Sequence, residues 1–150
     1  MIRQNTDTLA DLYLADETAW LDAMAQLIRG GHLVDLDYPH LMEYLQDMAT
    51  RDRREVNSRL KVLLTHLLKW TYQKEMRTPS WVSTILNQQD DLEDLLESGV
   101  LRNHAEESLA AIYPKALKHA ARETELPAET FPAECPWTLD QLLSADVLAD

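Results

Sequence analysis

Between Pro39 and Pro79 the chain contains no glycine or proline, so nothing in this stretch interrupts a helix. Asp37 stands just ahead of Pro39, an order typical of a helix start, because proline fits the first turn. Apolar residues follow the 3.6-residue period of an α-helix and form one stripe. The stripe consists of Leu41, Leu45, Met48, Val56, Leu60, Leu63, Leu67 and Trp70. The pattern predicts a long helix over about 38–74, with this stripe in the core.

Helical patterns also occur on both sides of this stretch. Apolar residues recur at helical spacing within 6–29, as one helix or two, and the glycines at 30–31 end the pattern. Thr78 and Pro79 have the residue types of an N-cap and a first helical position, which predicts a further helix running to Gly99.

A fourth helix and a tail complete the predicted fold. Asn103 can cap a helix over about 104–124, and short helical turns are expected after it. The tail residues expected to hold these turns on the bundle are Phe131, Trp137, Leu139, Leu142 and Leu143. The sequence therefore predicts an all-α protein. It forms one domain spanning 1–150, a compact bundle of four main helices with a long central helix and a short helical C-terminal tail.

Composition supports this class. Of the 150 residues 45% are hydrophobic, which is too many for a disordered chain, and the 3 glycines are too few for an all-β fold. No apolar run approaches the roughly 18 residues of a membrane span, and the first residues lack the apolar core of a signal peptide. The single cysteine, Cys135, has no partner for an internal disulfide. We expect a cytoplasmic protein that does not bind membranes.

Charge is unevenly distributed along the chain, whose formal net charge is -12. Segment 51–81 holds eight basic and three acidic residues, a net charge of +5, whereas the remaining six basic and 23 acidic residues give -17. The acidic majority repels polyanions, so nucleic-acid binding is not expected. Acidic helices packed around a basic one would account for the pattern. A basic surface for a protein partner is the alternative.

Several side chains along one edge of the long helix could perform chemistry: Asp52, Glu55, Arg59, His66 and Gln73. Glu55 and Arg59 form an i,i+4 pair. In a catalytic interpretation His66 is a general base, Glu55 orients it and Arg59 holds an anion. The alternative is a structural ion-pair network, because charges beside a buried stripe need partners. No residue spacing identifies a reaction.

We predict no metal and no cofactor. Three histidine–acid pairs share a helix face, but such pairs bind a metal only where several converge. They are His40 with Glu43, His104 with Glu107, and His119 with Glu123. The Glu-x-x-His motif of di-iron bundles is absent, and the nearest sequence is Asp37-x-x-His40. With so few glycines the chain also lacks a phosphate-binding glycine-rich loop.

A polar strip with a basic bias is predicted on the outer face of the long helix: Arg54, Ser58, Lys61, Thr65, Lys69 and Tyr72. It continues into Arg77 and Trp81, so the candidate binding residues for a partner are Lys69, Tyr72, Arg77 and Trp81. Alternatively, this stretch is a structural corner in which Trp70 is buried, Trp81 folds back over it and Arg77 stacks on an indole ring. Only the cations would then be free for a partner.

Two stretches resemble a known protein family. LLTHLLKWTYQ with the following RTPSW turn, and FPAECPWTLDQLL, are similar to the bacterial domain-of-unknown-function family 29, and the likeness spans nearly the whole chain. The matching residues include Trp20, Asp37, Glu43, His66, Lys69, Trp70, Tyr72, Arg77, Trp81, Phe131, Pro132, Cys135 and Pro136. The resemblance implies an all-α, cytosolic bacterial protein, and it implies no catalytic residue. The chain departs from the pattern at Tyr44 and Gln46, where acids are common, and at Ala49, where glycine is usual.

The function expected from the sequence is a non-catalytic interaction protein. It would be an adaptor-like helical module, or an antitoxin-like one that neutralises a basic partner with its acidic surface. We expect a protein partner docked through the Lys69–Trp81 region, and a homo-oligomer is compatible with the sequence. The alternative is a small hydrolase or nuclease that uses Glu55, Arg59 and His66.

Overall fold

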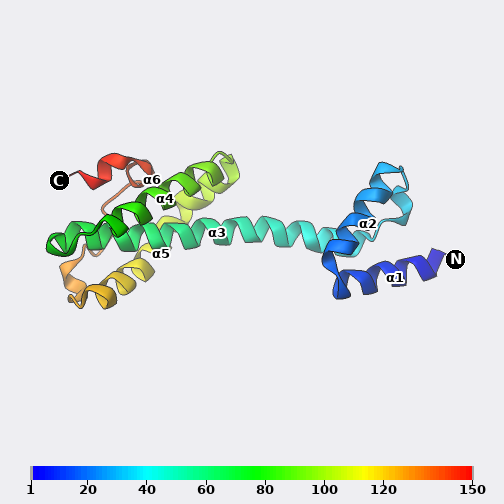
Figure 1. The fold of residues 1–150 in the computed structure, drawn as a ribbon, viewed down its shortest axis with the longest axis horizontal. Helices are drawn as coiled ribbons and strands as arrows, with labels where there is room; N and C mark the ends of the chain where they lie inside the picture. The colour runs from blue at the N-terminus through cyan, green and yellow to red at the C-terminus, as the bar shows by residue number, and fades with distance from the viewer. Residues whose placement is uncertain (1, 150) are drawn as a thin grey trace. The chain divides into compact units, whose positions relative to one another are not determined.

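The structure, a computed structural model, describes residues 2–149, with the side chains of residues 8–149. Its α-helices are α1 (Ile2–Ala15), α2 (Glu17–Arg29), α3 (Tyr38–Tyr72), α4 (Pro79–Leu95), α5 (Gly99–Thr124) and α6 (Leu139–Leu143) (Figure 1). Short 3-10 turns lie between or after them: η1 (Leu33–Asp35), η2 (Lys74–Met76), η3 (Ala128–Thr130) and η4 (Ala145–Leu148). No strand occurs within 2–149, which confirms the predicted all-α class with its long central helix. None of these helices is long and apolar enough to cross a membrane.

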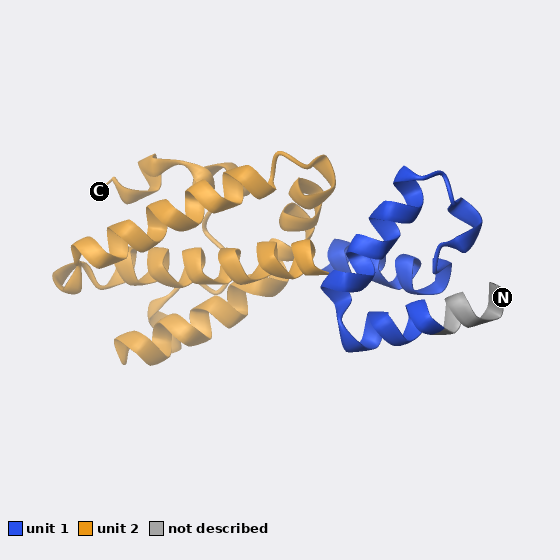
Figure 2. Ribbon diagram, turned by 45° about the vertical axis from the view of Figure 1, so that its right-hand side comes forward, with its two compact units in different colours: residues 1–50 blue, residues 51–150 orange. Residues whose placement is uncertain are grey.

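The chain divides into two compact units, residues 1–50 and residues 51–150 (Figure 2). The helix α3 belongs to both, because the boundary falls within it. The single domain expected from the sequence stays a prediction.

Unit 1 has a small core around the buried side chains of Trp20 and Met24 in α2. The helical pattern within 6–29 forms two helices because Asp16 caps α2, its Oδ1 accepting a hydrogen bond from Ala19 N at 3.1 Å. After α2, Gly31 adopts a φ of +75°, a left-handed conformation that glycine takes without strain. The double glycine therefore ends α2 as expected.

The core of unit 2 is built around the second half of α3. Apolar side chains on several faces of this half are buried, among them Val56, Leu60, Leu63, Leu64, Leu67 and Leu68. Ile85 and Leu92 of α4 are buried in the same cluster, as are Ala105 and Ala116 of α5. The second half of α3 is therefore covered on several sides by its neighbours in unit 2.

The predicted apolar stripe is buried only in this second half. Leu45 is 60% exposed, and Leu41 and Met48 are half-buried, although all three continue the stripe. Helical periodicity aligns side chains on one face, but burial also requires a neighbouring element over that face. Among the described residues no element covers Leu45, so this part of the prediction is wrong.

The connection between α4 and α5 also differs from the prediction. Thr78 caps α4 and Pro79 is its first residue, as expected. However, α4 ends at Leu95, and α5 begins at Gly99 instead of near residue 104. The reason is that Ser98 caps α5: its Oγ accepts a hydrogen bond from Leu101 N at 3.3 Å. Asn103 lies inside the first turns of α5 and is not the cap.

The tail packs on unit 2 through the residues expected from the sequence. Phe131, Leu139 and Leu142 are buried, and Trp137 and Leu143 pack against the same core. A contact that the sequence does not reveal adds to these: buried Gln89 of α4 donates through Nε2 to two tail carbonyls. The distances are 2.8 Å to Leu142 O and 3.0 Å to Ser144 O.

Tyr113 of α5 is expected to limit stability at high pH. Its buried hydroxyl donates to Pro132 O at 2.6 Å, and burial raises the pKa of the phenol from 10.0 to about 12. The folded-state pKa is the higher one, so this contribution is complete below the unfolded value and is lost as pH rises toward the folded one. Urea unfolding across this range should show a steeper loss of stability in the parent than in Tyr113→Phe. Equal slopes would contradict this assignment.

Candidate functional site

The segment from Lys69 to Trp81 forms a corner between α3 and α4. Thr78 Oγ1 accepts a hydrogen bond from Trp81 N at 3.3 Å, which fixes the first turn of α4. Trp81 is half-buried, and Lys69 Nζ lies 4.6 Å from the centre of its ring. Lys69 Nζ also forms an ion pair with Glu123 of α5 at 3.1 Å. Lys69 thus bridges α4 and α5.

Arg77 completes the corner. Its Nε donates to Trp70 O at 2.9 Å, and its guanidinium carbon lies 4.0 Å from the centre of the Trp70 ring. Trp70 Nε1 in turn donates to Leu148 O of the tail at 3.2 Å. The predicted stacking of Arg77 on an indole ring is confirmed. This corner joins the end of α3 to the tail.

The corner leaves less free surface than the sequence predicts. Lys69 is only 13% exposed, because Glu123 and Trp81 cover it. Tyr72 packs edge-on against Phe131, with ring centres 5.5 Å apart. Lys69 and Tyr72 therefore do not lie on an open outer face of α3. The predictions that Lys69 and Tyr72 face outward, and that the cations of the corner are free, are wrong. The physical reason is that α5 and the tail cover this end of α3.

Glu55 and Arg59 come together as predicted. Arg59 Nε donates to Glu55 Oε1 at 3.1 Å, and Arg59 Nη1 reaches Asp91 Oδ2 of α4 at 2.7 Å. The same Nη1 also donates to Gln88 Oε1 at 3.3 Å. Arg59 therefore holds α3 to α4, and its positive charge is matched by two carboxylates. This arrangement agrees with the structural alternative.

His66 stands apart from that pair. Its Nδ1 donates to Val62 O of its own helix at 2.9 Å. Glu55 is eleven residues earlier, and the rise of an α-helix separates the two residues by roughly 16 Å along the axis. Within the part of the chain that is described, His66 thus contacts neither Glu55 nor Arg59. Glu55 cannot orient His66 directly as a base.

Unit 1 contains a buried polar cluster that was not predicted from the sequence. Asp37 is 3% exposed, and its Oδ2 accepts a hydrogen bond from Trp20 Nε1 at 3.1 Å and one from His40 Nδ1 at 2.7 Å. Tyr13 stacks on His40 at 4.4 Å between ring centres and contacts Trp20 edge-on at 4.8 Å. The Asp37-x-x-His40 spacing was the local signal. Trp20 lies too far away in sequence to be predicted as the third member.

Two further side chains, Tyr13 and Cys135, have raised pKa values, which makes them poor nucleophiles. Burial, followed by the nearby carboxylates of Glu43 and Asp47, raises the pKa of the Tyr13 phenol. Burial likewise raises the pKa of the Cys135 thiol, whose Sγ donates to Trp137 O at 3.3 Å. Both groups are therefore protonated at neutral pH.

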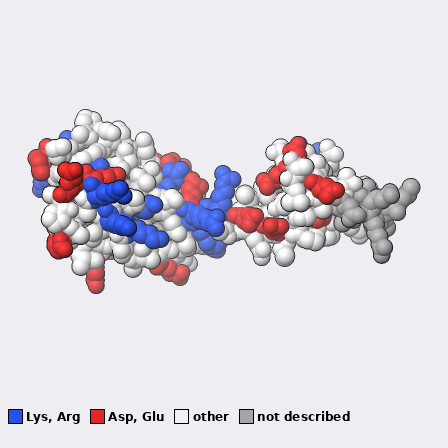
Figure 3. All heavy atoms as spheres, turned by 90° about the horizontal axis from the view of Figure 1, so that it is seen from below, with Lys and Arg blue, Asp and Glu red and all other residues white. Residues whose placement is uncertain are grey.

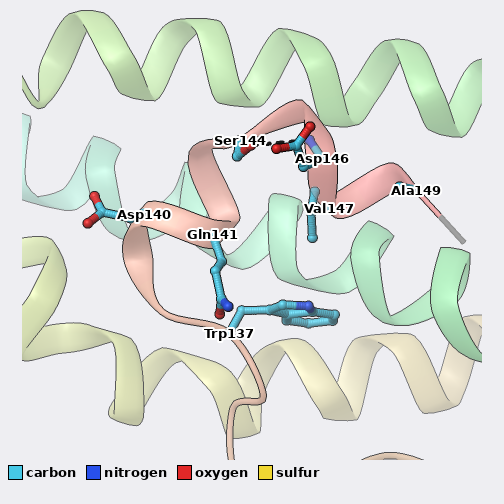
Figure 4. Close-up of a pocket in the computed structure, with 7 residues that line it drawn as sticks. All are labelled: Trp137, Asp140, Gln141, Ser144, Asp146, Val147 and Ala149. Carbon is cyan, nitrogen blue, oxygen red and sulfur yellow. Dashed lines mark hydrogen bonds between the residues drawn. The ribbon is translucent and has the colours of Figure 1, made fainter.

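A hollow of about 500 Å³ lies in the tail (Figure 4). Its lining residues are Trp137, Asp140, Gln141, Ser144, Asp146, Val147 and Ala149. Asp140 pairs with Arg102 of α5, and Ser144 Oγ accepts from the backbone nitrogen of Asp146 at 3.2 Å. The lining residues given above include two carboxylates and no histidine, lysine or cysteine that could act beside them as a base or nucleophile. Across the described residues, no three histidine, cysteine or acidic side chains converge to hold a metal.

These features define an all-α protein with a long central helix, in which most of the candidate residues make contacts between helices. The chain matches the family described as Domain of unknown function DUF29 over residues 12–148, and it belongs to that family. The resemblance seen in the sequence is thereby confirmed. No curated protein and no solved structure matches the chain.

Proposed function

We propose that this protein is a non-catalytic, cytoplasmic interaction module that docks a basic amphipathic helix of a protein partner. The observation that supports the proposal most is an exposed apolar face on the first turns of α3 in unit 1. We call it the α3 face. Its residues are Tyr38, Leu41, Met42, Leu45 and Ala49.

The α3 face has the geometry of a helix-binding surface. Its residues follow the i, i+3, i+4, i+7 spacing of one helical face and, with Gln46, line a hollow of about 380 Å³. Tyr38, Met42 and Leu45 are between 55% and 60% exposed. Three large exposed apolar side chains on one helical face are typical of an interaction site. Tyr38 is also held in place, because its hydroxyl donates to Leu33 O at 2.7 Å.

The negative charge of unit 1 favours a basic partner. Unit 1 contains two basic and nine acidic residues, a formal net charge of -7. Segment 38–49 itself has two acids and no lysine or arginine. An acidic surface of this kind accelerates the approach of a cationic partner and disfavours an anionic one. The antitoxin-like role expected from the sequence is one form of this function, with the contact placed in unit 1.

The test uses a synthetic 18-residue helix with leucine at i, i+3, i+4 and i+7 and lysine elsewhere. We expect calorimetry at low salt to detect binding to the parent protein. The double variant Met42→Ala/Leu45→Ala should weaken it by at least about tenfold, because buried apolar groups are lost. Binding should also weaken as salt screens the charges.

Two controls distinguish binding at the α3 face from nonspecific binding of the peptide elsewhere on the protein. Val100→Ala removes an exposed apolar residue of unit 2 and should leave the affinity unchanged. A peptide with glutamate in place of lysine should not bind. Equal binding of this acidic peptide, or of the double variant, would refute the proposal. A dimer of the protein that the double variant abolishes would refute it as well, since a second copy would then occupy the face.

A further inference from the structure

A hollow of about 300 Å³ lies in unit 2 between α3 and α5. We call it the basic hollow. Its lining residues are Arg54, Asn57, Ser58 and Lys61 of α3, and Ile112 and Lys115 of α5. Figure 3 shows that Lys and Arg atoms gather over unit 2 on the face seen from below. Arg54, Ser58 and Lys61 belong to the polar strip that the sequence predicts on the long helix. Lys115 joins them only because α5 packs on α3.

Arg54, Lys61 and Lys115, the three cations of the basic hollow, form no ion pair with an acid among the residues that the structure describes. Arg59, Lys69 and Arg102 of the same unit all form ion pairs with carboxylates. Across the described residues, by contrast, no carboxylate lies within ion-pair distance of Arg54, Lys61 or Lys115. The chain has 26 acidic and 14 basic residues, so acids were available to neutralise them. Three unneutralised cations around one hollow attract a multivalent anion.

The other polar residues of the hollow also supply hydrogen-bond donors. His104 Nε2 donates to Asn57 Oδ1 at 2.8 Å, which occupies the acceptor end of the Asn57 side chain. The amide nitrogen of Asn57 therefore keeps its protons for a ligand. The Ser58 hydroxyl is exposed and can donate as well. The hollow combines charge and donors and has no acidic side chain in its lining.

We propose that the basic hollow binds a small anion that carries a phosphate group. Cations and neutral donors around one cavity are the groups that hold phosphate oxygens. A long nucleic acid is disfavoured, because it would extend from this hollow over a protein of net charge -12. The volume of about 300 Å³ also lies at the lower end of the range for small-ligand pockets. The basic hollow lies in unit 2, whereas the α3 face lies in unit 1. The anion-binding proposal can therefore be tested independently of the helix-docking function.

The test measures binding of pyrophosphate by calorimetry, with sodium chloride at matched ionic strength in the reference. We expect saturable binding by the parent protein. Lys61→Met and Lys115→Met should each weaken it by about tenfold or more, as expected for the loss of a charged hydrogen bond. Methionine keeps the length of the lysine side chain. The matched control is Arg29→Ala in unit 1, an exposed residue whose loss changes the net charge equally and should leave the affinity unchanged.

Three results would overturn the proposal. The first is no binding of pyrophosphate to the parent beyond the sodium chloride reference. The second is equal affinity in Lys61→Met and Lys115→Met, with folding verified by circular dichroism. The third is tighter binding of a single-stranded RNA oligonucleotide than of pyrophosphate, lost in the same variants, because the ligand would then be a polyanion.

Discussion

Replacing Trp20 with alanine is expected to lower the free energy of unfolding of unit 1 by about 3–5 kcal/mol. Trp20 is fully buried and contacts the rings of Tyr13 and Tyr44. Its loss also removes the Nε1 donor to Asp37, whose buried carboxylate is costly to leave without that partner. The cavity and the missing donor act together, which makes this one of the largest single-residue effects expected in the chain.

Native-state hydrogen exchange is the appropriate measurement, because it reports each helix separately. Backbone amides of α2 should exchange much faster in Trp20→Ala. The control Trp20→Phe keeps most of the ring volume but not the donor, and should cost less, about 1–3 kcal/mol. Unchanged exchange in α2 would contradict the prediction. Faster exchange in α4 as well as α2 would show that the two units unfold together, as a single domain requires.

Replacing Phe131 with alanine should cost about 3–5 kcal/mol in unit 2. Phe131 is 4% exposed, and it packs against Tyr72 at the end of α3. The adjacent residue, Pro132, accepts the hydrogen bond from Tyr113, so the cavity lies beside the point where the tail meets α5. Urea unfolding followed by tryptophan fluorescence measures the change, since three of the four tryptophans are in unit 2.

Two variants calibrate this result. Phe131→Leu retains an apolar side chain and should be clearly less destabilising than Phe131→Ala. Met76→Ala removes a side chain that is 56% exposed and should change stability by no more than about 0.5 kcal/mol. A Phe131→Ala protein as stable as Met76→Ala would show that the tail contributes little to the fold.

Local signals in the sequence predicted the helices well. The absence of glycine and proline between Pro39 and Pro79 predicted α3 to within two residues at its end. Thr78 and Pro79 predicted the start of α4 because capping depends on neighbours in the chain. The start of α5 was missed because Ser98 and Asn103 are both acceptable caps, and the sequence does not rank them.

Contacts between distant residues could not be predicted in the same way. The Glu55–Arg59 pair was visible because its members are one helical turn apart. Asp91 was not, because it reaches Arg59 only after α4 has folded back along α3. The burial of Lys69 depends in the same way on Glu123 of α5. Periodicity shows which side chains share a face, whereas the neighbour that covers a face is a tertiary property.

The candidate sites show the same contrast between local signals, which the sequence predicts, and tertiary contacts, which it does not. His66 shared a predicted helix edge with Glu55, but helical rise separates residues that helical periodicity aligns. Leu41 and Leu45 of the α3 face were predicted as core, but Leu45 is exposed and Leu41 is only half-buried, so this face became a candidate surface only in the structure. The basic hollow needed Lys115 from α5 to complete it.

The attachment of the tail has a consequence for how the protein is made. Gln89 and Trp70 bind the tail through backbone carbonyls, and Phe131, Leu139 and Leu142 complete the core of unit 2. Synthesis proceeds from the N-terminus at roughly 5–20 residues per second, so these tail residues leave the ribosome after α3, α4 and α5. Until they emerge, the apolar surface that they cover stays open to water. We therefore expect nascent unit 2 to expose apolar surface of the kind that chaperones recognise until the tail has folded onto it.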